Sequence, residues 1–171
     1  MTFNREDPTT WPVFRPTIIA HDVGRSHDRS TAVVGGLGPF EPTLLGVTEF
    51  EELPQNQFGS ARASALAVID RRYYSNALIV ADLSNDASYA DNLLETFGAR
   101  VIGLQIGRHG NGMEFERRPV KGSAMLVYQI GRSYLLELLR SELQSGQVRI
   151  ADRPNSRRAF EQLVRLETEN A

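Results

Sequence analysis

The chain has 171 residues, no cysteine and a formal net charge of -2 at pH 7, which excludes a disulfide framework, thiol catalysis and cysteine-bound zinc. Hydrophobic residues make up 41% and charged residues 23%, as in a folded globular protein, and the length fits one domain with a sizeable core. No apolar run approaches the roughly 18 residues of a membrane span, and the polar first ten residues do not form a secretory signal. We therefore expect no membrane contact.

The first part of the sequence predicts an extended arm followed by a strand-rich region. Residues 1–16 contain three prolines and are expected to form the arm, so that a single domain occupies 17–171. Trp11 and Phe14 are expected to hold the arm against this domain. Apolar runs separated by turn residues then predict three strands, at 17–22, 31–37 and 43–50.

The rest of the sequence predicts helices that alternate with strands. Apolar residues at helical spacing predict helices at 59–72, at about 88–97 before Gly98, at 123–144, and after a cap at Asn155 or Ser156. Strands are expected at 77–82, at 101–106 and, as a short edge strand, at 148–151. Three strands followed by alternating helices and strands are typical of an α/β fold with a mixed sheet and helices on its faces.

Two aspartates stand at the ends of two apolar strands. Asp22 ends the first predicted strand and Asp82 ends the fourth. Strand ends are where open α/β sheets place their chemistry, and two neighbouring carboxylates repel each other unless a cation or a proton lies between them. The pair therefore predicts a divalent-metal site, although Asp is also common in the turns that follow strands. His21 is expected on the other face of its strand, as a packed residue.

The densest basic cluster is Arg117, Arg118 and Lys121, beside a glycine-rich loop. These residues are candidates for gripping a DNA phosphate backbone, which gives affinity without sequence preference. A solvated surface at the start of a helix explains them equally well. The pairs Arg71-Arg72 and Arg157-Arg158 are interpreted as ordinary surface charge.

Three segments are similar to a known family. The segment from His21 to Ala32 contains an Asp, a Gly and a second Asp before Thr-Ala; Val80-Ala81-Asp82 precedes a helix that ends at Gly98; and Pro119 to Ile150 ends in a Gly-x-Val-x-Ile strand. In this order and spacing, over roughly residues 15–167, the chain resembles the C-terminal nuclease domain of the large terminase subunit of tailed phages and prophages.

The resemblance implies a ribonuclease H-like fold and a nuclease function. The fold would be a mixed five-stranded sheet, with three antiparallel strands followed by parallel ones and helices on both faces. The activity implied is endonucleolytic cleavage of double-stranded DNA by two Mg²⁺ or Mn²⁺ ions during phage DNA packaging. It implies a cytoplasmic location in a bacterial host, with a separate terminase ATPase or other packaging proteins as partners.

The same resemblance assigns the site residues. Asp22 would bridge both metal ions and Asp82 would bind one of them. Asp28, Asp86 and Glu167 are additional candidates, although Asp28 is interpreted slightly better as a turn residue and Asp86 follows a strand where a turn is also expected. The candidates for holding DNA, proposed from their charge and not from the resemblance, are Arg117, Arg118 and Lys121.

Two departures from the family keep other functions open. The family's third acidic residue lies in an Asp-Asp pair on a later helix, which this sequence does not reach, and no Gly-x-x-x-x-Gly-Lys-Ser/Thr loop of an ATPase is present. A catalytically degenerate relative that acts as a DNA-binding or assembly module is therefore the alternative. A fragment of a sugar kinase or actin-like ATPase ranks last, because 171 residues cannot hold its two lobes.

Overall fold

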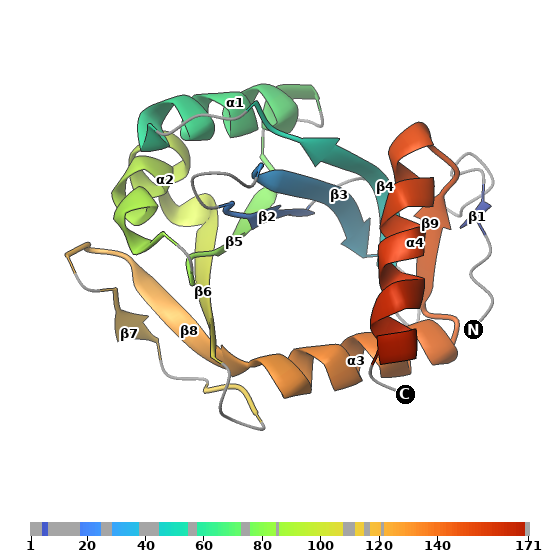
Figure 1. Ribbon diagram of the computed structural model, residues 1–171. Coiled ribbons are helices and arrows are strands. Elements are labelled where there is room, and N and C mark those ends of the chain that lie inside the picture. The colour runs from blue at the N-terminus through green and yellow to red at the C-terminus, as the bar shows by residue number, and fades with distance from the viewer. Residues whose placement is uncertain are drawn as a thin grey trace.

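Figure 1 shows the computed structural model of the chain, which describes residues 5–6, 18–24, 29–37, 45–54, 58–72, 76–84, 86–107, 112–114, 117–120 and 122–169. Within these residues, nine strands form one sheet in the order β1-β9-β4-β3-β2-β5-β6-β8-β7. The predicted contacts of Trp11 and Phe14 lie outside the described residues. No helix in the described part of the chain combines the length and the apolar character needed to cross a membrane.

The elements alternate much as the sequence predicts. The strands are β1 (Arg5–Glu6), β2 (Ile18–Asp22), β3 (Thr31–Leu37), β4 (Leu45–Glu52), β5 (Leu78–Asp82), β6 (Val101–Gly107), β7 (Arg118–Pro119), β8 (Leu126–Gly131) and β9 (Val148–Ala151). The helices are α1 (Gly59–Arg72), α2 (Ala90–Phe97), α3 (Arg132–Gln144) and α4 (Pro154–Glu169), with short 3-10 turns η2 (Ala87–Tyr89) and η3 (Gly98–Arg100).

The sheet is mixed, as expected, but it is larger than expected. β2, β3 and β4 pair antiparallel, and β5 and β6 continue parallel to β2, which confirms the predicted central five strands. The prediction that the sheet has only five strands is wrong. β8 and β7 extend one side, and β9 and β1 extend the other. β9 is therefore not an edge strand, because β1 pairs with it in parallel at Ile150 and Ala151.

The helix predicted over 123–144 is wrong in its first part. Residues 126–131 form β8, which pairs with β6 and with β7, and the helix α3 begins only at Arg132. Val127, Ile130 and Tyr134 happen to recur at helical spacing, but Val127 and Ile130 are buried in the sheet. Tertiary burial of these β-branched residues decides for the strand over the helical pattern.

The last helix begins slightly earlier than predicted. α4 starts at Pro154, so Asn155 and Ser156 lie in its first turn and neither is the residue before it. The Ser156 hydroxyl accepts a hydrogen bond from the Arg153 amide at 2.9 Å, and the Asn155 side-chain amide donates to the Phe50 carbonyl on β4 at 2.7 Å. Asn155 thus fastens α4 to the sheet. By contrast, α2 ends before Gly98 as predicted, where φ is +59°.

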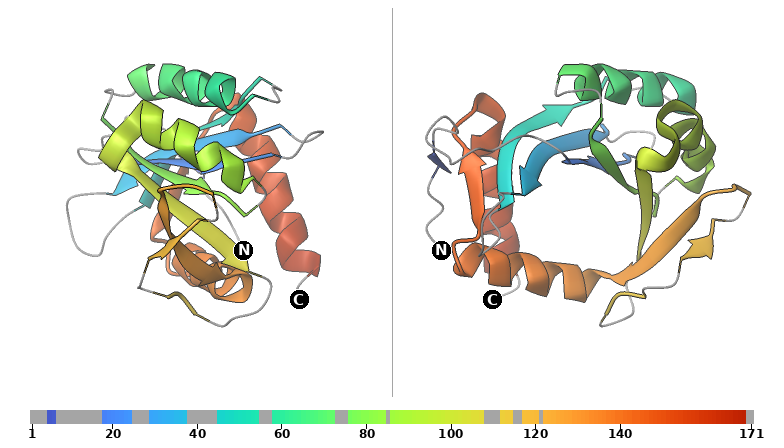
Figure 2. Two further views of the ribbon diagram at one scale, coloured as in Figure 1. Left: turned by 90° about the vertical axis from the view of Figure 1, so that its left-hand side faces the viewer. Right: turned by 180° about the vertical axis from the view of Figure 1, so that it is seen from behind.

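Different helices cover the two faces of the sheet. Along β2, Ile19 and His21 are buried whereas Ala20 and Asp22 are exposed, as the period of a strand requires. Helices α1 and α2 pack their apolar residues on the buried face and form the hydrophobic core with it. Helix α4 lies against β4 on the opposite side of the sheet from α2, as the two views of Figure 2 show. Asp22 thus lies on the face of the sheet opposite to the one on which α1 and α2 pack.

Candidate active-site cleft

The two aspartates singled out in the sequence lie side by side. β2 and β5 are parallel neighbours, and Asp22 is paired in register with Asp82. Adjacent strands are about 4.8 Å apart, and residues in register point to the same face of the sheet. Asp22 is exposed and Asp82 is half-buried. The expectation that the fold brings the two carboxylates together at one edge is met; their role as metal ligands stays a prediction.

Asp82 also stabilises the turn that follows β5, which is the alternative role for an aspartate at a strand end. The Ser84 amide donates to Asp82 Oδ1 at 2.9 Å, and the Ser84 hydroxyl donates to the same oxygen. The Ser84 hydroxyl oxygen in turn accepts from the Ile106 amide at 2.6 Å. This chain of hydrogen bonds fixes the Asp82 carboxylate at the end of β5 while its other oxygen takes no part in it.

On the opposite face of β2 lies a buried polar group. His21 is 2% exposed, as the strand alternation predicts, and its Nδ1–H donates to the Thr31 carbonyl at 2.9 Å. Burial lowers the pKa of His21 to about 4, and the charge of Arg62 acts in the same direction, against the hydrogen bond to Thr31. The ring packs edge-on against Tyr89 at a centroid distance of 5.7 Å. His21 is therefore a neutral core residue that does not face the aspartates.

Arg62 of α1 joins the segments that follow both acidic strands. Its guanidinium donates to the Gly24 carbonyl at 3.4 Å and to Asp86 Oδ2 at 2.5 Å, and it stacks over the Tyr89 ring. Burial acts to raise the pKa of Asp86, but hydrogen bonds from Ser88 and Arg62 hold that pKa below its usual value. Within the described residues, His21 Nε2, Arg62 Nε and the Tyr89 hydroxyl have no hydrogen-bond partner.

Of the remaining predicted site residues, the structure describes the side chains of Asp86, Arg117 and Arg118. Asp86 is engaged by Arg62 and Ser88, as described. Asp28 and Lys121 lie outside the described residues, as does the side chain of Glu167, whose backbone belongs to α4. Arg117 is exposed, and Arg118 on β7 pairs with Glu114 at 2.9 Å. Three strands separate β7 from β2, about 19 Å at the usual strand spacing.

A cleft opens on the Asp22 face, between the sheet and α4. It has a volume of about 680 Å³, and its lining includes Asp22, Thr31, Glu52, Arg132 and Arg158. Glu52 is paired in register with Thr31, and Thr31 with Asp22. One row across the sheet therefore carries three acidic residues, Glu52, Asp22 and Asp82.

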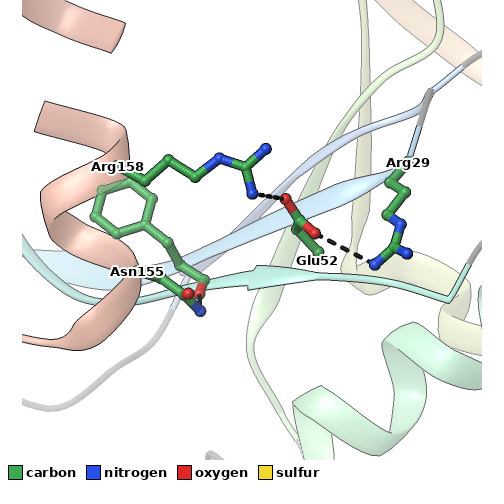
Figure 3. A network of polar contacts seen from close by, with 5 residues as sticks. Arg29, Glu52, Asn155 and Arg158 are labelled. Atoms are coloured by element: carbon green, nitrogen blue, oxygen red, sulfur yellow. Dashed lines mark hydrogen bonds and ion pairs between the residues drawn. The ribbon is translucent and has the colours of Figure 1, made fainter. Parts of the chain in front are cut away.

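Apart from Asp22, sequence reasoning missed the charged residues of this cleft. Figure 3 shows Glu52 between two arginines: Arg158 Nη1 lies 2.7 Å from Oε1, and Arg29 Nη1 lies 3.4 Å from Oε2. Arg158 is exposed, as expected, but it also lines the cleft. The only sequence signal for Glu52 was the Glu51-Glu52 pair just after the third predicted strand, which continues two residues further than expected.

The described residues contain no cluster of three or more His, Asp or Glu side chains arranged to hold a metal ion. At the strand ends the structure places a pair of carboxylate side chains, Asp22 and Asp82. Glu52, in the same row, is turned to its two arginines. In its chemistry the carboxylate pair fits Mg²⁺ or Mn²⁺, which prefer oxygen ligands and keep several water molecules.

Comparisons with known proteins show a likeness of structure. No protein-family model matches the chain, and no curated protein matches it. The structure is similar to the crystal structure of the large terminase nuclease from thermophilic phage G20c, with a TM-score of 0.48 and 19% sequence identity. The match covers 81% of this chain and 59% of the phage protein.

Proposed function

We propose that this chain is a metal-dependent DNA endonuclease of the terminase nuclease type, which hydrolyses phosphodiester bonds of double-stranded DNA. The observation that carries the proposal is the register pairing of Asp22 with Asp82 beside an open cleft. The sequence resemblance in the segments around both aspartates supports the same reading. In a phage or prophage setting, the domain would cut DNA during packaging, together with a separate ATPase.

The proposed roles of the two aspartates are those that the sequence resemblance implies. Asp22, exposed at the cleft, and Asp82, its partner in register, would hold the Mg²⁺ or Mn²⁺ ions. Bound there, such ions supply an activated water and stabilise charge on the leaving oxygen. Ser84 holds one carboxylate oxygen of Asp82, so the side chain is oriented before a ligand arrives. Such preorientation lowers the entropic cost of binding.

A catalytically degenerate relative that binds DNA or assembles with other proteins is the second candidate. One observation favours it: among the described residues no third carboxylate joins the pair, and Glu52 in the same row is held by Arg29 and Arg158. The two candidates differ in whether the aspartate pair binds metal and cuts DNA.

Mn²⁺-dependent nicking of supercoiled plasmid tests the proposal. Wild type is compared with Asp22→Asn and Asp82→Asn, and with Glu95→Gln as a control. Glu95 is an exposed carboxylate on α2, the helix that covers the other face of the sheet. We expect nicking by wild type and by the control, and none by the two Asn variants.

Calorimetric titration with Mn²⁺ on the same four proteins decides between the candidates. Binding by wild type and Glu95→Gln, lost in Asp22→Asn, supports the nuclease. If wild type neither cuts DNA at high enzyme concentration nor binds Mn²⁺, the catalytic proposal is wrong. DNA binding that survives in all four proteins then supports the degenerate relative.

A further inference from the structure

The cleft beside Asp22 is lined by the acidic residues Asp22, Glu51 and Glu52 and by Arg132 and Arg158, and guanidinium groups meet at Glu52. Two guanidinium groups, those of Arg158 on α4 and Arg29 before β3, share the single Glu52 carboxylate. Arg132, the first residue of α3, also lines the cleft. Two segments that are distant in sequence therefore bring arginines to one carboxylate (Figure 3).

A competing anion can displace the Glu52 carboxylate from its two arginines, because both ion pairs are exposed to water. The side chains of Arg158, Arg29 and Glu52 are 70%, 61% and 39% exposed, so water screens both ion pairs. Exposed pairs of this type contribute little to stability. A guanidinium binds a phosphate with the same planar pair of donors that it offers to a carboxylate.

The position of the cleft decides which anion is relevant. Thr31 of β3 is paired in register with Glu52 on one side and with Asp22 on the other, so Glu52 and Asp22 lie in one row with a single residue between them. A phosphate held by Arg158 and Arg29 therefore lies next to the strand end that carries Asp22. By contrast, Arg118 on β7 and its neighbour Arg117 are separated from β2, the strand of Asp22, by the three strands β5, β6 and β8.

We propose that this cleft is the site that binds the DNA phosphate backbone, with Arg158 and Arg29 exchanging the Glu52 carboxylate for a phosphodiester group. Glu52 acts as an internal competitor that occupies the two arginines until DNA arrives. The proposal rests on the proposed function in naming DNA as the ligand, and it identifies the residues that hold the substrate. It assigns to Arg158 the role that the sequence suggested for Arg117, Arg118 and Lys121.

The test measures DNA binding without cleavage. A fluorescein-labelled duplex is titrated with protein in EDTA, and anisotropy is followed over a series of NaCl concentrations. Wild type is compared with Arg158→Gln and with Arg157→Gln, its exposed neighbour on α4, which is not among the cleft-lining residues. Both variants lose one positive charge, so a difference between them reports a contact and not the net charge.

We expect Arg158→Gln to weaken binding roughly fivefold to tenfold and to reduce the slope of log affinity against log salt by about one, as for one lost phosphate contact. Arg157→Gln and Arg118→Gln should keep the wild-type slope. Arg158→Lys, which keeps the charge but loses the planar fork, should fall between Arg158→Gln and wild type.

The reverse experiment removes the competitor. Glu52→Gln should bind the duplex several-fold more tightly than wild type, whereas Glu161→Gln, an exposed carboxylate elsewhere on α4, should tighten binding much less. A structural role of Glu52 predicts the opposite sign, because a disturbed fold binds DNA less well. Circular dichroism melting curves show whether each variant is folded.

Three results would overturn the proposal: equal losses for Arg158→Gln and Arg157→Gln, weaker binding by Glu52→Gln, or no duplex binding by wild type at low salt. Its failure is separable from failure of the nuclease function. A protein that cuts plasmid but keeps its affinity in Arg158→Gln refutes only the phosphate site. A protein that binds through Arg158 but never cuts refutes only the nuclease.

Discussion

Lowering the pH from 7 to 5 is expected to destabilise the fold through His21. The ring is 2% exposed, it lies beside Arg62 and Tyr89, and burial lowers its pKa to about 4. In the unfolded chain the same imidazole titrates near its ordinary value of 6.5. As the pH falls through 6.5, the unfolded state takes up a proton that the folded state refuses until about pH 4. The contribution of His21 to the free energy of unfolding is therefore fully present above pH 6.5, and it is lost as the pH falls from 6.5 to about 4.

The size of the effect follows from the two pKa values. Between pH 7 and pH 5, the difference in proton uptake at His21 amounts to roughly 2 kcal/mol of unfolding free energy. The total loss below pH 4 is roughly 3 kcal/mol. Ordinary carboxylates titrate mostly below this window, so the histidine dominates the change from pH 7 to pH 5.

Urea denaturation at pH 7 and at pH 5, on wild type and His21→Leu, measures the effect. Leucine removes the titrating ring from a buried strand position, so the variant should lose most of the pH dependence, whatever its own stability. His27 and His109 remain in the variant and report the background. A wild-type unfolding free energy that is the same at both pH values, or an equal decrease in His21→Leu, would refute the reasoning.

Two further predictions concern stability. Asp70→Asn should cost about 2 kcal/mol, because it removes the charge from two hydrogen bonds that Arg100 donates to a 4% exposed carboxylate; urea midpoints measure the loss, and an unchanged midpoint would contradict it. Gly35→Ala should cost about 1–3 kcal/mol, because the new Cβ would lie 2.5 Å from the backbone oxygen of Gly46. Gly112→Ala, which meets nothing within 4 Å, is the control and should melt within a degree or two of wild type.

The acidic pair was predictable from the sequence, because each aspartate ends a local apolar run. Strand ends that carry polar residues meet at one edge of a parallel sheet, so the register of Asp22 with Asp82 follows from the order of elements. The burial of His21 follows from the alternation of side chains along β2. These features depend on neighbours in sequence.

The charged cleft was not predictable, because it depends on residues far apart. Glu52 and Arg158 are 106 positions apart, and nothing local marks either as a partner of the other. β8 was mistaken for helix for a similar reason. Its Val127 and Ile130 fit a helical spacing, and only pairing with β6 makes them residues of a strand. Local sequence patterns therefore do not predict ion pairs between distant surface residues or the pairing of distant strands.

The place of α4 in the chain has a consequence for biosynthesis. The proposed phosphate site needs Arg158, which leaves the ribosome long after the strands that carry Asp22 and Glu52. β9 likewise pairs with β1, so the first described strand finds its partner only after the seven strands between them in the chain have been made. Pairings of such long range form slowly and late. A nascent chain thus carries its acidic pair well before its arginines arrive, and the proposed phosphate site would be complete only once α4 has been made.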